Sequence, residues 1–332
     1  MIGSSFVHAS YPPNNGQELS LLPPHFLCQA SRSMTSKAIN RGSEYLIGIQ
    51  QPNGLWQDYE LPVGPSDEWV TGFAGLALSE ISNLGYIDAR PELALAALTL
   101  SLRERYSGGW GYNSTCKADT DSTSIVIQFF EQLGWRVNLR SRQFVASHWR
   151  PQYGGFATYD GPLAWGTGHW DVTPYALLSV SLDARKEMLP VFLNSLAKHR
   201  DKTAGWRSYW WSSNLYSSLV TLEALSSLNA VYAVLPFNDF LDHKPCSAFE
   251  LACLLGIAHH AHWSHDYVRN LMVQLLDHQL SDGSWEGSPQ LRLTEPVCYE
   301  PWLRPNGNSY VDVNSVITTA IAIRVLAKIG SA

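Results

Sequence analysis

A turn that ends in an aromatic residue recurs along the chain, and this repeat constrains the fold more than any other feature. The segments "RGSEYLIGIQQPNGLW", "LRERYSGGW" and "LLDHQLSDGSW" carry Gly before Trp56, Trp110 and Trp285, and Phe156 and Trp206 end similar turns. The first four end residues are 54, 46 and 50 positions apart. The gap of 79 to the last leaves room for one degenerate unit. Spacings of this kind indicate a repeat architecture.

An apolar segment with helical periodicity follows each turn. These segments cover 68–81, 121–134, 171–182, 213–228 and 313–330, and a sixth covers 247–260 without a clear Trp turn before it. They are apolar on nearly all sides, so we expect them to be buried. More amphipathic helices, such as 90–106 and 267–280, alternate with them; the weakest outer position, near 230–243, contains Pro236. The alternation predicts an all-α fold: a single (α/α)6 barrel, or toroid, with repeated Gln…Gly-x-Trp turns.

The chain length suits one such barrel, which we expect over residues 36–332 after an N-terminal arm of residues 1–35. A net charge of −6 without any Lys/Arg run argues against nucleic acid as a partner. The five cysteines form no Cys-x-x-Cys pair, which argues against a zinc site or a disulfide framework. The oligomeric state is open.

The sequence also bears on location. It has neither a signal-peptide pattern nor an apolar run of about 18 residues, so we expect a cytoplasmic protein. The segment "LSLLPPHFL" (19–27) either packs on the domain or contacts a membrane surface, and both readings stay open.

Two carboxylates stand directly before one of the most apolar segments, in "CKADTDSTSIVIQFF". One acid is enough to cap a helix, so Asp119 and Asp121 together exceed what capping needs. Parallel inner helices would bring their N-terminal ends together at one end of the barrel. Burial and a like charge both favour the protonated form of a carboxyl, and two carboxyls in contact can share a proton. The pair could therefore hold an acidic proton at neutral pH.

At these residues the sequence resembles the class II terpene cyclases, the family of squalene-hopene cyclase, which carry an Asp-x-Asp-Asp motif on an α/α barrel. "DTDST" (119–123) matches with Ser122 in place of the last acid, and "GGWGYN" (108–113) precedes it. "DVTPY" (171–175) is similar to the family's Asp-Val-Thr-Ala-His, with Tyr175 in place of His. The resemblance covers residues 36–330. The chain has length for only one barrel, so it is most similar to the monodomain cyclases of bacterial meroterpenoid pathways.

The resemblance implies that a linear polyprenyl chain, attached to an aromatic acid, is cyclised through carbocations after protonation of an alkene. It implies that Asp121 is the general acid and Asp119 its partner. Ser122 can donate a hydrogen bond, and Tyr175 can only donate or relay through its hydroxyl. Asp171 lies one helical turn before Tyr175 and either orients that hydroxyl or caps its helix. No cofactor and no metal are expected.

Aromatic faces stabilise a carbocation without trapping it, by about 0.5–2 kcal/mol each. The residues expected to contact the substrate are Trp110, Tyr112, Asn113, Tyr159, Trp165, Trp170, Trp210, Trp211 and Tyr216. Trp56, Trp206 and Trp285 are assigned to the structural turns. A carboxylate head group would meet an Arg or a His, and Arg292, Arg304, His169 and His260 remain equally open.

Other functions fit parts of the pattern. An α/α-toroid glycoside hydrolase would pair Asp119 with Asp171 across a sugar. A non-catalytic repeat scaffold would leave the acidic pair without a purpose. Class I ionisation needs Asp-Asp-x-x-Asp, and the near miss "NDFLD" (238–242) is expected to be a loop. The prenyltransferase β subunit needs Asp-x-Cys, which does not occur in the sequence.

Overall fold

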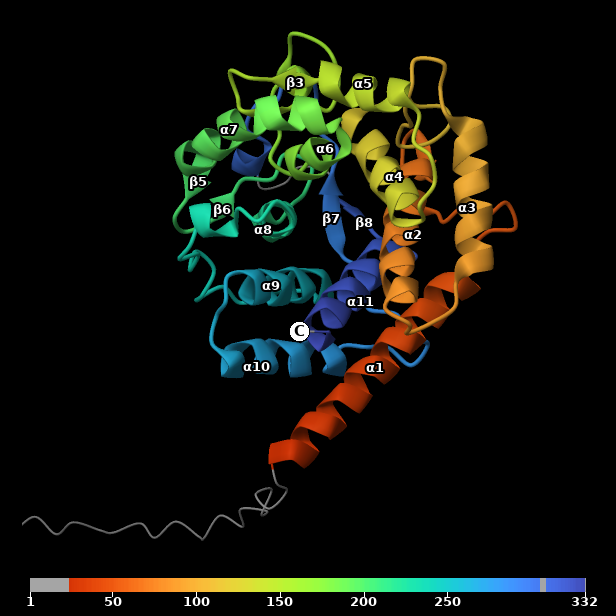
Figure 1. Ribbon diagram of the computed structural model, residues 1–332, viewed down its shortest axis with the longest axis vertical. Helices are drawn as coiled ribbons and strands as arrows, with labels where there is room; N and C mark the ends of the chain where they lie inside the picture. The colour runs from red at the N-terminus through yellow and green to blue at the C-terminus, as the bar shows by residue number, and fades with distance from the viewer. Residues whose placement is uncertain (1–23, 305–308, 332) are drawn as a thin grey trace, which may run out of the picture.

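Six inner helices form a closed ring in the computed structural model, which describes residues 24–304 and 309–331. They are α2 (Glu68–Asn83), α4 (Thr120–Gln132), α6 (Thr173–Ser179), α8 (Asn214–Ser227), α9 (Ala248–His260) and α11 (Val316–Gly330). Each packs against the next in this order, and α11 packs against α2 (Figure 1). All six were predicted from their apolar segments, so the all-α toroid is confirmed.

The outer layer contains one helix fewer than expected within the described residues. It consists of α1 (Pro24–Gly48), α3 (Arg90–Arg103), α5 (Leu139–Ser147), α7 (Leu182–His199) and α10 (His265–Asp277). The expected outer helix near 230–243 is replaced by a loop with one short 3-10 turn, η2 (Val231–Ala233). In this loop the Phe237 ring stacks on Trp206 at 5.2 Å and the Phe240 ring packs against Gly205, so two aromatic side chains cover the turn. Asp239 pairs with Arg200 at 2.7 Å, which leaves "NDFLD" without a free acidic cluster.

The repeated turns have one hydrogen-bond pattern. Each indole N–H of Trp56, Trp110, Trp206 and Trp285 donates to the backbone carbonyl ten residues earlier, at 2.6–3.1 Å. The backbone N–H of the same residue donates to a Thr or Ser hydroxyl of the following inner helix. The turn thus joins the end of an outer helix to the start of an inner one.

Replacing Trp285 by Phe should lower the free energy of unfolding by about 2 kcal/mol, because the change opens a gap and removes the indole donor of the Leu275 carbonyl, which then keeps the longer bond of 3.3 Å from the backbone N–H of His278. Urea unfolding followed by far-UV circular dichroism measures this. Trp135→Phe is the matched control, since Trp135 is 37% exposed and should change stability by less than about 0.5 kcal/mol. Equal losses in both variants would contradict the structural role of the turn.

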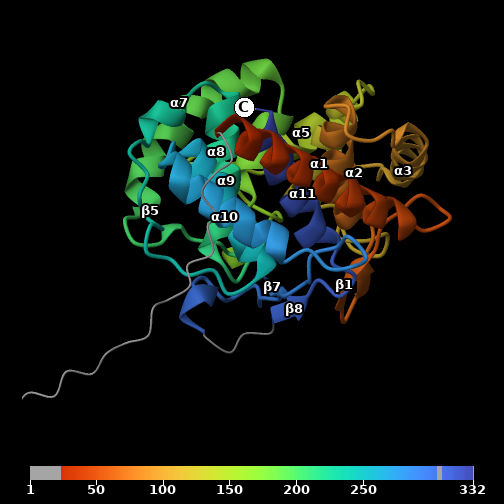
Figure 2. The ribbon, with the colours of Figure 1, turned by 90° about the horizontal axis from the view of Figure 1, so that it is seen from below.

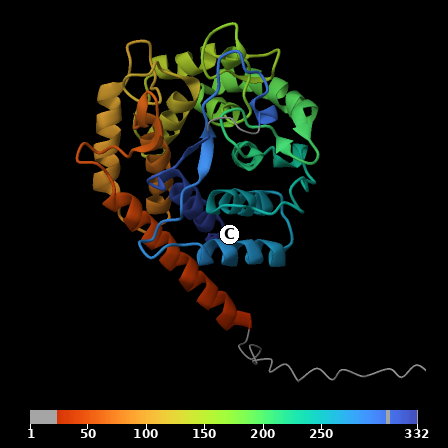
Figure 3. The ribbon, with the colours of Figure 1, turned by 180° about the vertical axis from the view of Figure 1, so that it is seen from behind.

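Four short two-stranded sheets connect the helices. β1 (Asp58–Leu61) pairs with β2 (Gly64–Ser66), and β7 (Pro289–Arg292) pairs with β8 (Ser309–Val311). The other two, β3 (Trp149–Arg150) with β4 (Gly155–Phe156) and β5 (Arg200–Asp201) with β6 (Gly205–Trp206), belong to the repeated turns. Figure 2 shows β1, β7 and β8 at one end of the barrel, and Figure 3 shows β7 across the middle of the ring.

The first and last repeats are joined directly. The Asp58 carboxylate accepts hydrogen bonds from the backbone N–H groups of Asn314 (3.1 Å) and Val316 (2.9 Å), where α11 begins. Helix α1 packs along α11. The ring is therefore closed by contacts between residues more than 250 positions apart.

The N-terminal boundary differs from the expected one. Helix α1 begins at Pro24, so the predicted limit between arm and domain at residue 35 falls inside a helix, and residues 1–23 of the arm lie outside the described residues. Among the described residues, none of the helices combines the length and the apolar character needed to cross a membrane.

Candidate active site

A cavity of about 1150 Å³ lies at the end of the barrel where the inner helices begin. Its wall includes Trp69 from the start of α2, Asp119 and Asp121 at the start of α4, Trp210 before α8, and Arg292 from β7. Parallel inner helices thus gather their N-terminal residues around one space, as the repeat predicted. The two carboxylates singled out in the sequence both face it.

Asp119 caps α4 and is held by one neighbour. Its Oδ1 accepts the backbone N–H of Ser122 at 2.7 Å, and its Oδ2 accepts the Ser122 hydroxyl at 2.8 Å. Burial raises the pKa of Asp119 to about 7, although the two hydrogen bonds from Ser122 oppose that rise. Ser122 therefore supplies two donors to Asp119 at the position where the related motif has a third acid.

Asp121 lies in the first turn of α4 with part of its surface open to the cavity. Burial raises the pKa of Asp121 well above its ordinary value, and the negative charges of Asp119 and Asp171 raise it further. A hydrogen bond from Trp69 acts in the opposite direction. Of the two carboxyls, Asp121 is therefore the better candidate to keep its proton, while Asp119, which accepts two hydrogen bonds from Ser122, is the better supported anion.

Asp119→Asn should move the alkaline limit of activity to lower pH. The Asp119 charge raises the pKa of Asp121, so an uncharged amide lets Asp121 ionise earlier as the pH rises. Asn also caps helices well, so α4 should persist. The measurement is kcat/KM against pH, which reports groups of the free enzyme. An alkaline limit that stays in place or rises would contradict the coupling.

Four of the expected aromatic residues line the cavity: Tyr112, Tyr159, Trp165 and Trp210. The Trp165 ring lies 5.4 Å from Tyr159 and 5.6 Å from Trp210. The indole N–H groups are already used, by Thr294 (3.0 Å) for Trp165 and by Thr158 (2.7 Å) for Trp210. With these polar edges satisfied, the rings can offer their π faces to the cavity.

His169 is buried behind this wall and stays neutral. Trp210 donates to the Thr158 hydroxyl, so that hydroxyl donates in turn to His169 Nδ1 (2.8 Å), and Nε2–H donates to the Ala164 carbonyl (3.0 Å). Burial lowers the pKa of His169 to about 3. His169 does not line the cavity, so it is unsuited to hold an anionic head group.

Several residues expected to contact the substrate lie elsewhere. Trp110 is a turn residue like Trp56, because its indole N–H donates to the Leu100 carbonyl. Asn113 fixes the 113–116 turn, since its Oδ1 accepts the backbone N–H groups of Thr115 and Cys116, and its amide N–H groups donate to the Val63 and Pro65 carbonyls. The others off the wall are Trp170, which packs on Phe192 and His199, and Trp211, which is stacked between Tyr216 and Phe249.

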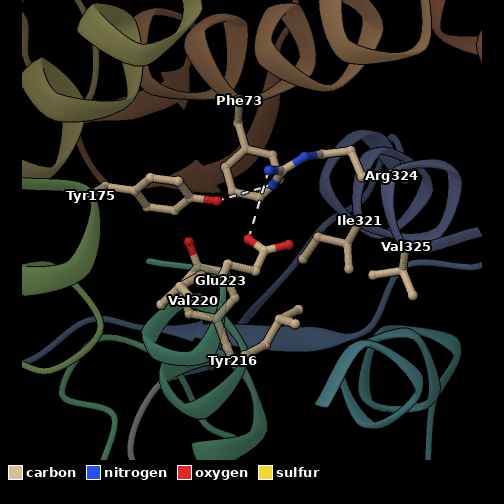
Figure 4. A pocket seen from close by; sticks show the side chains of 9 residues that line it. Phe73, Tyr175, Tyr216, Val220, Glu223, Ile321, Arg324 and Val325 are labelled. Carbon is tan, nitrogen blue, oxygen red and sulfur yellow. Dashed lines mark hydrogen bonds and ion pairs between the residues drawn. The ribbon is translucent and has the colours of Figure 1, made fainter. Parts of the chain in front are cut away.

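Tyr175 points away from the large cavity. Its hydroxyl accepts a hydrogen bond from Arg324 Nη1 at 3.0 Å, beside a space of about 10 Å³ that Tyr216 also lines (Figure 4). Arg324 pairs with Glu80 at 2.9 Å and lies 3.6 Å from Glu223. The expectation that Tyr216 contacts substrate in the main chamber is therefore corrected. Tyr175, expected to donate or relay through its hydroxyl, is turned toward the middle of the barrel by its pairing with the buried Arg324.

Asp171 neither caps its helix nor orients Tyr175, contrary to both expected roles. Its Oδ2 accepts the backbone N–H groups of Trp210 (2.6 Å) and Trp211 (3.3 Å). Burial raises the pKa of Asp171 to about 6. Asp171 does not line the cavity, so it acts on the site by fixing the backbone that carries Trp210 and through the charge that raises the pKa of Asp121.

Some wall residues were missed. Trp69 lies beside Asp121 and, like it, begins an inner helix, so the same rule could have found it. Arg105 forms an ion pair with Glu68 and donates to the carbonyls of Asn113 and Cys116. Leu291 and Leu293, beside Arg292, come from a segment without any motif. Of the proposed head-group residues, Arg304 and His260 do not line the cavity.

The comparisons with known proteins bear on the fold of this chain. No family model and no curated protein matches the sequence. The solved structures that share its architecture include the type II terpene cyclases, so the resemblance expected from the sequence is confirmed at the level of the fold.

The type II terpene cyclase MstE from Scytonema, solved with geranylgeranyl dihydroxybenzoate as substrate, has a TM-score of 0.78 and 23% identity over 91% of this chain and 99% of that one. The ent-copalyl diphosphate synthase of Streptomyces platensis has a TM-score of 0.52 and 16% identity, over 79% of this chain and 50% of that one. A heparin-specific unsaturated glucuronyl hydrolase also reaches a TM-score of 0.52, with 11% identity over 92% of this chain and 98% of that one.

Proposed function

We propose that this chain is a class II terpene cyclase, in which Asp121 protonates an alkene of a linear polyprenyl chain and the aromatic wall stabilises the carbocations that follow. The observation that carries the proposal is a pair of carboxyls, Asp119 and Asp121, at the wall of a large cavity lined by aromatic rings, where burial raises the pKa of Asp121 well above its ordinary value. An alkene is a weak base, so only a neutral acid in a water-poor space can protonate it. The proposal includes a single barrel domain and a cytoplasmic location.

The residues of the cavity wall have different roles in the proposed reaction. Asp121 supplies the proton, and Asp119, held by Ser122, carries negative charge that keeps the Asp121 proton in place until substrate arrives. Trp69 donates to the Asp121 carboxylate once the proton has left. Tyr159, Trp165 and Trp210 then face the migrating cation. Loss of a proton from the last cation would give a cyclic isomer of the substrate.

The size of the cavity agrees with a large substrate. Its volume of about 1150 Å³ lies just above the range of about 300–1,000 Å³ found for most small-molecule sites. MstE binds geranylgeranyl dihydroxybenzoate, and we propose a substrate of the same kind here, a prenyl chain attached to an aromatic acid.

The hydrolase alternative lacks its second carboxylate. It required Asp119 and Asp171 to face one another across a sugar, but Asp171 is turned to the backbone of Trp210 and Trp211 and does not line the cavity. A purely structural scaffold would leave a cavity of this size, with an acidic proton in its wall, without a use.

Incubation with geranylgeranyl dihydroxybenzoate in D2O tests the proposal. Protonation by Asp121, after exchange with solvent, places one deuterium on carbon, and elimination of a protium then gives a cyclic product one mass unit heavier than the substrate. Mass spectrometry detects the increase of one mass unit, and ²H NMR detects the deuterium on carbon. Deuterium-free product, or diphosphate release from geranylgeranyl diphosphate as the sole activity, would overturn the protonation mechanism.

A further inference from the structure

The large cavity contains one partly buried cation that no carboxylate neutralises. Arg292, at the end of β7, lines the cavity beside Leu291 and Leu293. Its Nη1 and Nη2 donate to the carbonyls of Ser208 (3.0 Å) and Ser212 (3.1 Å). Across the described part of the chain, no Asp or Glu lies within ion-pair distance of this guanidinium.

The two hydrogen bonds leave much of the guanidinium unused. Arg has five N–H donors, and only two of those of Arg292 are occupied by the described residues, so Nε–H and one N–H on each Nη remain. Nε, which makes no hydrogen bond to the described residues, is not among the buried atoms without a partner, so this nitrogen is accessible at least in part. A fork of this kind matches the two oxygens of a carboxylate.

The other positive groups of the wall are committed or lie at the surface. Arg105 is neutralised by Glu68, and its remaining nitrogen is used by two carbonyls. Lys117 is exposed. Burial lowers the pKa of His148, which keeps that imidazole uncharged. Among the described residues that line the cavity, Arg292 is thus the partly buried cation without an ion pair, and the charge of Asp171 acts on it from beyond ion-pair distance.

We propose that Arg292 is the anchor for the head group and that it selects a substrate bearing one carboxylate rather than a diphosphate. The inference rests on the proposed function and narrows its substrate class. The backbone N–H of Arg292 donates to the Trp210 carbonyl at 2.6 Å, so the backbone segments that carry the guanidinium and the indole ring are joined directly. An aromatic acid can stack on Trp210 or Trp165 while its carboxylate meets Arg292, and its prenyl chain extends toward Asp121 in the same cavity. One cation balances one carboxylate but not the larger charge of a diphosphate.

Binding can be measured without turnover in an Asp121→Asn background. The probes are geranylgeranyl dihydroxybenzoate, its methyl ester and geranylgeranyl diphosphate. Quenching of tryptophan fluorescence measures the binding of each. The acid should bind about 10- to 100-fold more tightly than the ester, as expected for a hydrogen-bonded charge pair. Adding Arg292→Gln should bring this ratio close to one, and Arg292→Lys should keep part of it. Lys117→Gln is the matched control and should leave the ratio unchanged.

The outcomes test the binding role of Arg292 separately from the proposed cyclisation. An unchanged ratio in Arg292→Gln, loss of the ratio in Lys117→Gln, or tighter binding of the diphosphate than of the acid would each overturn the inference. Arg292 also holds two backbone carbonyls, so thermal melting checks the fold of each variant, and Arg292→Lys retains the charge if the Gln variant fails to fold. If the chain with Asp121 intact makes no cyclic product while the ratio depends on Arg292, the proposed function fails and the anion site stands.

Discussion

Asp121→Asn is expected to lower turnover by about 10³-fold or more, because an amide cannot supply the proton that starts the reaction. Binding of substrate should persist, since Asn fills the same space. The measurement is product formation by mass spectrometry under saturating substrate. A variant that keeps more than about a tenth of the rate would remove Asp121 from the role of general acid.

The same variant should fold at least as stably as the original chain at pH 7. The pKa of Asp121 is raised in the folded protein, so the unfolded state releases its proton first, and the folded state loses stability as the pH rises above the ordinary value of 3.8. Asn removes this dependence. The stability gap between the two proteins should therefore grow from acidic to neutral pH, as urea unfolding at several pH values would show. A less stable variant at pH 7 would mean that the carboxyl also has a structural task.

Arg324→Leu should lower the free energy of unfolding by about 3–5 kcal/mol, because it leaves the partly buried Glu80 without its main partner and removes one of the two cations beside the buried Glu223. Arg324 is 6% exposed and binds Glu80 through two hydrogen bonds of 2.9 Å, while Glu223 lies 3.6 Å away. Burial would raise the pKa of Glu223, but Lys328 and Arg324 together lower it to about 2. Urea unfolding measures the loss.

Arg90→Leu is the control for this cluster. Arg90 makes hydrogen bonds of 2.8 and 2.7 Å to Asp88, but the pair is exposed, so its removal should change stability little. Combining Arg324→Leu with Glu80→Gln should recover part of the loss, because the second change removes an uncompensated charge. Similar losses for Arg90→Leu and Arg324→Leu would contradict the importance of burial.

Much of the helical framework could be predicted because its causes are local. The apolar segments and the Gly-x-Trp turns lie within a few residues of one another, and the predicted inner helices begin within three residues of the observed ones. The Asp119–Asp121 pair is also local, since both acids belong to the start of one helix. The short α6, which ends at Ser179, and the loop that replaces an outer helix were not visible in the apolar pattern.

Roles that depend on distant contacts could not be predicted. Tyr175 meets Arg324, 149 positions later in the chain, and this contact decides where its hydroxyl points. Arg292 reaches the site from a strand without a motif. The prediction for Trp110 was wrong for a different reason. Its position at the end of a repeated turn indicated a structural role, but its closeness to the acidic motif in the sequence suggested contact with substrate. Side chains next to a motif do not necessarily face the same space as the motif.

The ring that joins α11 to α1 and α2 has a consequence for how the protein comes apart. An open array of repeats exposes two terminal units, which can fray while the middle stays folded. Here each inner helix touches two others, and the carboxylate of Asp58 ties the beginning of the circle to its end. In an open array, loss of the last helix only removes one terminal unit. Here it would open the ring. We therefore expect melting to be all-or-none, with the pocket for substrate lost in the same step as the framework.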